Sequence, residues 1–362
     1  MTTMKAVELH APGKFRLRTD VPVPEPGPDE VRIRVEAAGI CGTDVHICQD
    51  DASMRGIVAP PVVLGHEFCG LVDKVGRNVT RVRPGEYVSA EMHEVCYQCP
   101  ACRDKQYHAC SKTKIRGVNL PGAFAEYVVV SGTNVVKLPA GLPRKVAAIL
   151  DPLGNAVHTA LKVPVQDRAV AIVGYGPIGA MCAEVVLFAG CKHLFIVDVS
   201  DRSLARARGW LERRAVQDRV TIVDARETPG PVPRVIGATE GGVDVSLEMS
   251  GHPSGINNAI QMTRAAGHVV HLGIPKDADV AIQGFGKNVI FKGLTLHAVI
   301  GREMFATWDK MLDLLQRGMT ESIASFVTAE LPLESFGEGL DRFAKGLEGK
   351  VVLYPQGVPA RR

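Results

Sequence analysis

Four cysteines crowd into one short stretch of the chain, "CYQCPACRDKQYHAC". They are Cys96, Cys99, Cys102 and Cys110, in the spacing C-x2-C-x2-C-x7-C. Four thiolates on one short loop match the closed tetrahedral coordination of a structural zinc ion. An iron–sulfur cluster also takes four cysteines, but no other feature of the sequence calls for electron transfer. The spacing therefore predicts a structural zinc site.

A second group of possible metal ligands and acid–base residues lies nearer the N-terminus. "AAGICGTDVH" brings Cys41, Thr43 and His46 close together, and "LGHEFCG" adds His66 and Glu67. A catalytic zinc ion needs about three protein ligands and an open position, and cysteine, histidine and carboxylate suit that role. Taken alone, however, the first stretch favours a buried cysteine and an N-capped helix with a surface histidine.

The motif "GYGPIG" has the GxGxxG pattern of a dinucleotide-binding turn. It follows the apolar run "AVAIVG" and opens a helix with Pro177 near its start, a context that makes the pattern specific. Gly174 permits the tight turn, Gly176 lets the backbone approach a pyrophosphate, and Gly179 allows close packing of helix and strand. The N-terminus of the helix attracts the phosphates. We therefore expect a dinucleotide at this turn.

Asp198 ends the next apolar run, "HLFIVD". A carboxylate there accepts hydrogen bonds from the adenosine ribose hydroxyls and repels a 2′-phosphate, which favours NAD over NADP. Arg202 follows four residues later. Stacking on adenine and ordinary solvation are equally good interpretations of this arginine.

These residues need two kinds of domain to position them. "VRIRVEAAGI" alternates apolar and polar residues, and "EYVSAEM" and "AEYVVVSG" are further short strands, which predicts a small β-rich, barrel-like domain up to about residue 155. Five strand-like runs then alternate with helical stretches, which predicts a doubly wound parallel sheet of the α/β class. The helix "EMFATWDKMLDLLQRG" and the strand "KVVLYP" belong to a tail that we place with the first domain.

Composition bounds the function of the chain. Of the 362 residues, 46% are hydrophobic and 22% charged, and the net charge of +3 is too small to indicate a nucleic-acid partner. No apolar run reaches the roughly 18 residues of a membrane helix, and the N-terminus lacks the apolar core of a signal peptide. We therefore expect a cytoplasmic protein that binds neither nucleic acid nor membrane.

Taken together, "CGTDVH", "GHE", the four-cysteine loop, "GYGPIG" and Asp198 resemble the zinc-dependent medium-chain dehydrogenases over nearly the whole chain. The resemblance implies a GroES-like catalytic domain at 1–155, whose zinc lobe is near 93–112, and an NAD-binding Rossmann domain at 156–299. It implies that residues 300–362 return to the catalytic domain. It also implies two zinc ions per chain, one catalytic and one structural, and a homotetramer.

The same resemblance assigns roles around the catalytic metal. Cys41 and His66 would hold zinc. Many relatives supply a third ligand from a later cysteine, but the corresponding segment here, "DPLGNAVHT", has none, so a carboxylate must serve. Glu67 is our choice, and Asp151 is the alternative that approaches the metal or its water. Thr43 and His46 would form a relay that carries the substrate proton to solvent.

On the cofactor side, the resemblance implies a lining of Ile178, Leu272, Gly273, Ile274, Val299 and Ile300. The family often has an arginine five residues after the acidic residue, whereas this chain has Ser203 there and its arginine at 202.

The resemblance also implies a small-molecule substrate, and longer segments narrow the class of that substrate. "GVNLPGAFAEY", "DPLGNAVHTAL" and "VIFKGLTLHAVIGREMFATWDKM" resemble the members of the family that oxidise the β-hydroxyl of L-threonine. His93 matches a family position near the active site. Two interpretations of this residue are open: a place in the substrate pocket, or a structural role. A polyol or other secondary alcohol is the alternative substrate, because those members share the ligands and the relay. A non-enzymatic NAD sensor is an interpretation from another class, and the intact set of Cys41, Thr43, His46 and His66 argues against it. A zinc-dependent nucleic-acid module, suggested by the four-cysteine loop alone, is disfavoured by the low net charge.

Overall fold

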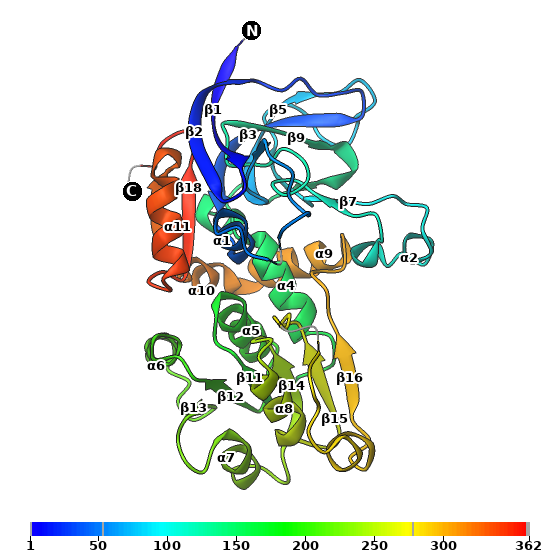
Figure 1. Ribbon diagram of the computed structural model, residues 1–362, viewed down its shortest axis with the longest axis vertical. Coiled ribbons are helices and arrows are strands. Elements are labelled where there is room, and N and C mark those ends of the chain that lie inside the picture. Colours follow the sequence, from blue (N-terminus) through cyan, green and yellow to red (C-terminus); the bar gives the residue numbers. More distant parts are fainter. Residues whose placement is uncertain (1, 53, 277–278, 360–362) are drawn as a thin grey trace. The chain divides into compact units, whose positions relative to one another are not determined.

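The computed structural model describes residues 2–52, 54–276 and 279–359, and the chain divides into two units (Figure 1). Unit 1 combines the chain up to Pro152 with the chain from Glu303 onward, and unit 2 is Leu153–Arg302. The C-terminal segment thus folds with the N-terminal part. No helix in the described part of the chain combines the length and the apolar character that a membrane crossing needs.

Unit 1 is built on a seven-stranded sheet of order β10-β6-β5-β3-β18-β17, with β9 paired to β3. A three-stranded sheet, β2-β1-β4, and the short pair β7-β8 complete it. Its strands are β1 (Thr3–Ala11), β2 (Lys14–Pro22), β3 (Glu30–Gly39), β4 (Val62–Val63), β5 (Glu67–Val75), β6 (Tyr87–Ala90), β7 (His93–Glu94), β8 (Lys114–Ile115), β9 (Tyr127–Ser131), β10 (Val135–Lys137), β17 (Val327–Pro332) and β18 (Lys350–Tyr354).

Strand β3 explains how this sheet places the N-terminal ligands. Val31, Ile33 and Val35 alternate inward and are fully buried, as expected for a strand with one face on the core. The end of the strand is buried on both sides, and β18 pairs with it antiparallel at Ala38 and Gly39. The C-terminal strand therefore lies beside the residues that lead into Cys41.

The helices of unit 1 are short, and along the chain they come mostly in the segments that connect its strands. They are α1 (Gly42–Cys48), α2 (Pro100–Arg103), α3 (Arg144–Ala147), α9 (Ala306–Leu314), α10 (Thr320–Ala324) and α11 (Phe336–Ala344), together with the turns η1 (Tyr107–Ala109), η2 (Gly132–Asn134), η4 (Leu315–Met319) and η5 (Leu333–Ser335). The helix α4 (Leu150–Ala160) begins in unit 1 and ends in unit 2. The helix predicted from residue 303 begins only at Ala306, because Phe305 has a positive φ of 70°.

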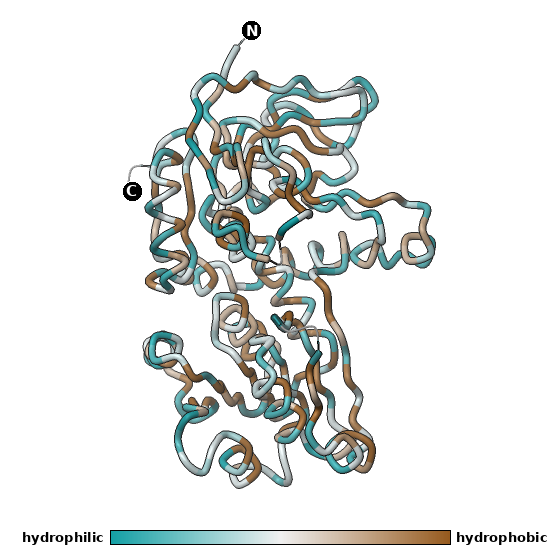
Figure 2. Tube along the Cα trace, viewed as in Figure 1, coloured by the Kyte–Doolittle hydropathy of each residue, from teal (hydrophilic) through white to brown (hydrophobic). Residues whose placement is uncertain are grey.

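Unit 2 is a six-stranded parallel sheet of order β13-β12-β11-β14-β15-β16. Figure 2 shows brown, hydrophobic stretches along these strands, as a sheet covered on both faces requires. The strands are β11 (Ala169–Val173), β12 (His193–Asp198), β13 (Val220–Asp224), β14 (Val243–Glu248), β15 (Thr263–His271) and β16 (Thr295–Ala298). The helices are α5 (Pro177–Phe188), α6 (Asp201–Arg214), α7 (Pro231–Gly237) and α8 (Pro253–Met262), with the π-helical turn η3 (Gly286–Ile290).

The strand order reverses between β11 and β14, because β12 follows β11 on one side and β14 lies on its other side. In open parallel sheets, ligands bind outside the carboxyl ends of the strands at such a reversal. The GxGxxG turn leaves β11 at this point. The topology of unit 2 thus places the motif at the expected dinucleotide crevice.

Candidate active site

Cys41, His66 and Glu67 come together in unit 1, with one ligand atom from each residue within 4.8 Å of the others. Cys41 is the N-cap of α1, His66 precedes β5, and Glu67 begins β5. Glu67 pairs with Gly39 across the sheet, and a Cβ atom at Gly39 would lie 2.3 Å from Glu67 Oε2. Glycine at 39 therefore makes room for the carboxylate. One thiol, one imidazole and one carboxylate form a donor set that suits catalytic zinc.

Asp44 supports two of these ligands. It accepts a hydrogen bond from the Cys41 backbone N–H at 2.8 Å, and its other oxygen lies 3.7 Å from His66 Nδ1. Burial raises the pKa of Asp44 to about 6. Burial alone would lower the pKa of His66, but the negative charges of Cys41, Asp44 and Asp151 raise it well above its usual value. A carboxylate beside the second nitrogen of a histidine ligand orients the ring toward a metal.

Lys350 is a buried cation beside the same cluster. It begins β18, is 1% exposed, and donates from Nζ to both oxygens of Glu67 at 2.9 and 2.7 Å. It also donates to the Ile40 carbonyl at 2.5 Å. Burial would lower the pKa of Lys350, but Glu67 and Cys41 raise it. Lys350 therefore stays charged and fixes the orientation of the Glu67 carboxylate.

Thr43 and His46 lie on α1, three positions apart, and so share one side of the helix. Thr43 Oγ1 is 3.7 Å from Cys41 Sγ. The side chain of His46 is 46% exposed, and its Nδ1 lies 3.0 Å from Asp51 Oδ2. The threonine hydroxyl is thus near the metal ligands and the histidine is in contact with solvent. Asp151, in the first turn of α4, is close enough to His66 to act on its charge.

The four cysteines of the zinc lobe also come together, and their sulfurs lie within 4.8 Å of one another. The separations are 3.6 Å for Cys96–Cys110, 3.9 Å for Cys99–Cys110 and 4.0 Å for Cys96–Cys102. A zinc ion about 2.3 Å from each of four tetrahedral sulfurs would place those sulfurs about 3.8 Å apart. These three separations lie close to that value, so the cluster fits a zinc ion.

Backbone N–H groups point at these sulfurs. Cys99 N–H donates to Cys96 Sγ at 3.3 Å, and Lys112 N–H donates to Cys110 Sγ at 3.4 Å. The N–H groups of Cys102 and Ser111 lower the pKa of the Cys99 thiol to about 6. Such bonds stabilise thiolates, the form that binds metal.

We predict that Cys99→Ser loosens this lobe, because structural zinc contributes folding free energy. A loss of at least ~2 kcal/mol corresponds to a decrease in Tm of roughly 4–8 °C for a unit of about 200 residues. Calorimetry with elemental analysis would measure both Tm and zinc content, with Ser111→Ala, on the exposed surface of the lobe, as the matched control. Full zinc content and unchanged Tm in Cys99→Ser would contradict a structural metal.

The GxGxxG turn of unit 2 has the geometry that its glycines predict. Gly174 has a φ of 97°, and a Cβ atom at Gly179 would lie 2.1 Å from the Gly174 carbonyl oxygen. A Cβ atom at Gly176 would meet nothing within 4 Å, so the backbone there is open to a ligand. Pro177 begins α5 and Ile178 follows it. The N-terminus of α5 can therefore receive a pyrophosphate.

Asp198 ends β12 and is already bound to backbone N–H groups on both of its oxygens. Oδ2 accepts from Tyr175 N–H at 2.6 Å, and Oδ1 accepts from Val199 and Ser200 N–H at 2.7 Å each. The carboxylate thus ties the phosphate-binding turn to the end of β12. Oδ2, which accepts only one of these bonds, keeps a further acceptor position for a ribose hydroxyl. Arg202 lies in the first turn of α6, which follows directly.

The remaining predicted cofactor residues lie after β15 and β16. Leu272, Gly273 and Ile274 follow β15, and Val299 and Ile300 follow β16. Ile274 and Ile300 are 85% and 62% exposed, whereas Val299 is buried. All five follow the carboxyl ends of parallel strands, where ligands bind in such sheets.

Asp44, Asp51 and Lys350 were not predicted from the sequence. Asp44 had a local signal, because its side chain accepts from the Cys41 backbone three positions earlier as in a capping box. Asp51 lies five residues from His46. Lys350 is 283 residues from Glu67, and its role depends on the pairing of β18 with β3.

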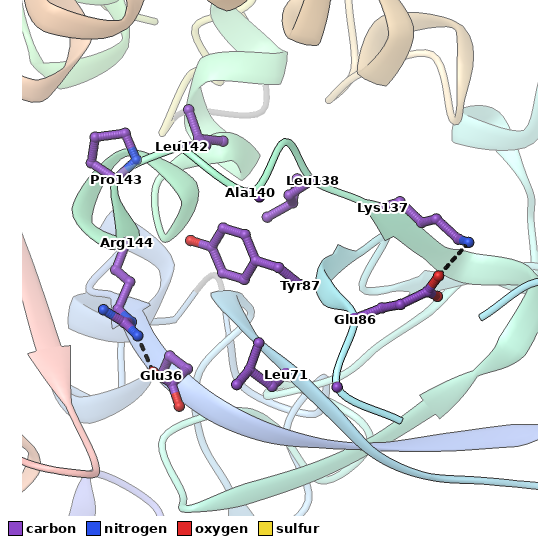
Figure 3. A pocket seen from close by; sticks show the side chains of 11 residues that line it. Glu36, Leu71, Glu86, Tyr87, Lys137, Leu138, Ala140, Leu142, Pro143 and Arg144 are labelled. Atoms are coloured by element: carbon purple, nitrogen blue, oxygen red, sulfur yellow. Dashed lines mark hydrogen bonds and ion pairs between the residues drawn. The ribbon is translucent and has the colours of Figure 1, made fainter. Parts of the chain in front are cut away.

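A cavity of about 580 Å³ lies elsewhere in unit 1, around Tyr87 (Figure 3). Arg144 pairs with Glu36 at 2.8 Å on one side of it, and Lys137 pairs with Glu86 at 2.7 Å on the other. Its lining includes none of the candidate ligands. The charged side chains around Tyr87 therefore pair with one another and are not part of the metal cluster.

Comparison with known proteins places this site in a family. The model for the alcohol dehydrogenase GroES-like domain matches residues 27–140, and the model for the zinc-binding dehydrogenase matches residues 177–317. The chain belongs to the zinc-containing medium-chain dehydrogenase family. It is an oxidoreductase that uses zinc and a nicotinamide cofactor, as the resemblance of the sequence predicted. The predicted fold class, a GroES-like domain with a Rossmann domain, is confirmed.

Within the family, the chain is similar to proteins named L-threonine 3-dehydrogenase. The one from Bacillus licheniformis is 43% identical over 92% of this chain and 94% of its own length. The one from Anaeromyxobacter dehalogenans is 42% identical over 93% and 94%. The narrower resemblance noted in the sequence is thus confirmed over nearly the whole chain.

Solved structures agree on the fold. An alcohol dehydrogenase from Thermus sp. ATN1 has a TM-score of 0.85 at 29% identity, covering 97% of this chain and 99% of that one. A 2R,3R-butanediol dehydrogenase from Bacillus subtilis has a TM-score of 0.84 at 27% identity, covering 98% and 100%. A zinc-binding dehydrogenase from Sinorhizobium meliloti, bound to NADP, has a TM-score of 0.82 at 27% identity, covering 98% and 100%.

Proposed function

We propose that this chain oxidises the β-hydroxyl of L-threonine to 2-amino-3-oxobutanoate, with NAD as the hydride acceptor. The observation that carries the proposal is the 43% identity, over 92% of the chain, to a protein named L-threonine 3-dehydrogenase. The segments "DPLGNAVHTAL" and "VIFKGLTLHAVIGREMFATWDKM" support the same assignment, whereas the metal ligands are shared with the polyol and secondary-alcohol members of the family.

A contact in unit 1 links the distinguishing segment "GREMFATW" to a candidate pocket residue. Trp308, from that segment, donates from Nε1 to Glu91 Oε2 at 3.0 Å. The other oxygen of this buried carboxylate lies 2.7 Å from His93 Nδ1. The segment therefore helps to orient His93, which we propose lies in the substrate pocket.

In the proposed reaction, Cys41, His66 and Glu67 hold a catalytic zinc ion, and Cys96, Cys99, Cys102 and Cys110 hold a structural one. When bound, the catalytic zinc ion supplies a Lewis acid that makes an alcohol hydroxyl more acidic, and the nicotinamide supplies the hydride acceptor. Thr43 Oγ1 would accept the substrate proton while its own hydroxyl proton moves on toward His46, which would release a proton to solvent. Asp51 holds the His46 ring through Nδ1, and Lys350 keeps Glu67 oriented. Asp151 adds negative charge beside His66.

Unit 2 would bind the cofactor through the turn Gly174–Gly179, Asp198, Arg202 and the segments 272–274 and 299–300. We propose that residues 1–155 act as the catalytic domain, that 156–299 act as the cofactor domain and that 300–362 complete the former. We also propose a homotetramer, on the basis of the family resemblance, and a cytoplasmic location, on the basis of the sequence patterns given above.

We predict that NAD supports turnover much better than NADP, because the Asp198 carboxylate repels a 2′-phosphate. Asp198→Ser should lower kcat/KM for NAD by roughly 10–100-fold, the effect of losing one hydrogen bond to a charged group. The kcat/KM for NADP should fall less than that for NAD, so the preference for NAD over NADP becomes smaller. Initial rates with both cofactors measure this, with Asp201→Ser, an exposed acid on α6, as the control. Equal kcat/KM for both cofactors in the unmodified protein would contradict the role of Asp198.

The substrate assignment is tested by initial rates with L-threonine, sorbitol and 2,3-butanediol under the same conditions. L-Threonine should have the highest kcat/KM of the three. The similarity to 2R,3R-butanediol dehydrogenase makes the diol the sharpest competitor. If a polyol or the diol gives the higher value, the threonine assignment is wrong, while the metal sites and the relay are unaffected.

A further inference from the structure

A buried carboxylate, Glu248, lies at the carboxyl end of β14 and has no part in the reaction described above. Its side chain is 0% exposed, with no lysine or arginine hydrogen-bonded to it among the described residues. Burying a charge is costly unless hydrogen bonds replace its hydration. The hydrogen-bond donors to the Glu248 carboxylate therefore indicate which part of the structure this residue holds in place.

Those groups all belong to the turn that follows β14. Glu248 Oε1 accepts hydrogen bonds from Ser250 N–H at 2.8 Å, from the Ser250 hydroxyl, and from Gly251 N–H at 3.1 Å. Oε2 lies 3.2 Å from the same Gly251 N–H. All three donors reach Oε1, and the Gly251 N–H is shared with Oε2. A glutamine at 248 would place an amide NH2 group at the Oε2 position, facing the Gly251 N–H, where these groups offer it no acceptor.

The same residue also organises the segment after β15. The Glu248 backbone carbonyl accepts from Leu272 and Gly273 N–H at 3.0 and 3.2 Å. A Cβ atom at Gly273 would lie 2.1 Å from Gly251 N and 2.7 Å from Glu248 Oε2. The turn at 250–251 and the segment 272–274 are therefore packed so closely that a shift of one must move the other.

The position of Glu248 relative to the sheet identifies the ligand that this packing serves. Asp198, on β12, lies on one side of β11, and Glu248, on β14, lies on the other. A dinucleotide that crosses the reversal point with its adenosine on Asp198 must place its nicotinamide half over β14 and β15. A Cβ atom at Gly174 would lie 3.0 Å from Ser250 N, so the turn after β14 also touches the GxGxxG turn.

We propose that Glu248 is a positioning residue, which holds the turn at 250–251 and the segment 272–274 as the surface beneath the nicotinamide half of the cofactor. The inference goes beyond the proposed function, because it applies to whichever alcohol the enzyme oxidises. It predicts a selective effect on one half of the dinucleotide.

The test compares two probes on the zinc-loaded, full-length protein: NADH, and ADP-ribose, which lacks the nicotinamide. Glu248→Gln should raise the Kd of NADH by roughly 10-fold or more, the effect of one buried donor left without an acceptor. The Kd of ADP-ribose should stay within about twofold. Ser250→Ala, which removes one hydroxyl from an exposed residue, should weaken NADH binding in the same direction by a smaller factor.

Glu184→Gln is the matched control, because Glu184 is a buried carboxylate of the same unit that accepts from Trp210 Nε1 at 2.9 Å. It should not discriminate between the two probes. Equal weakening of NADH and ADP-ribose by Glu248→Gln would assign Glu248 a general structural role and overturn the proposal. Unchanged NADH binding in Ser250→Ala would also overturn it, even if Glu248→Gln fails to fold.

Discussion

Cys41→Ser is expected to reduce turnover by roughly 10³-fold or more, since a catalytic metal supplies several kcal/mol of transition-state stabilisation and each 1.36 kcal/mol is tenfold in rate. Cys41 contributes the one thiol of the Cys41–His66–Glu67 cluster, and serine binds zinc poorly. Because unit 2 is unchanged, the variant should still bind NADH with the Kd of the unmodified protein.

The matched control is Cys48→Ser, on the same helix α1 but outside the metal cluster. Elemental analysis should show the loss of one zinc ion per chain in Cys41→Ser and none in Cys48→Ser. A Cys41→Ser protein that keeps most of its activity would exclude catalysis by a metal at this cluster. Equal zinc loss in both variants would indicate that any disturbance of α1 releases the metal, and would not identify Cys41 as a ligand.

His46→Ala is expected to lower kcat by roughly 10²–10⁴-fold at neutral pH, the usual range for a positioned acid–base group. The deficit should shrink as pH rises, because hydroxide can then remove the proton without the imidazole. The KM for NAD should change little, because the His46 side chain is exposed and pairs with Asp51. A pH–rate profile between pH 6 and 10 separates this loss from that of Cys41→Ser, which higher pH cannot restore.

Two further variants make the His46 result specific. Asp51→Asn should give a smaller loss in the same direction, because it keeps the ring in place but removes the charge beside Nδ1. His10→Ala, at an exposed histidine of β1, is the control and should be fully active. If His46→Ala is fully active at neutral pH, no relay passes through His46, and Thr43 remains only a neighbour of the Cys41 sulfur.

The parts of the fold that the sequence predicted are those encoded by local patterns. The alternation in "VRIRVEAAGI" predicted β3, and the glycine spacing in "GYGPIG" predicted the turn between β11 and α5. The four cysteines of the lobe lie within fifteen residues, so a short loop brings their sulfurs together whatever the rest of the chain does. Close spacing in the sequence therefore allowed the positions of these side chains relative to one another to be predicted.

Asp44 and Asp51 were missed although their partners are within five residues, whereas the other missed contacts join distant segments. The bond of Lys350 to Glu67 spans 283 residues, and that of Trp308 to Glu91 spans 217. Each contact requires the C-terminal segment to return to unit 1. The residue types near Glu67 or Glu91 do not indicate which distant side chain will bind the carboxylate. Glu248 was missed for another reason: at the end of an apolar strand, it resembles an ordinary surface acid until the packing of Gly251 and Gly273 is known.

The most direct test of threonine oxidation follows the hydride itself. Purified, zinc-loaded protein is incubated with NAD and with L-threonine that carries deuterium on the β-carbon, and the NADH formed is analysed by mass spectrometry. The proposed function predicts NADH with one deuterium, together with a slower rate than unlabelled L-threonine if hydride transfer limits turnover. Unlabelled NADH, or no NADH from L-threonine under conditions in which 2,3-butanediol is oxidised, would contradict it.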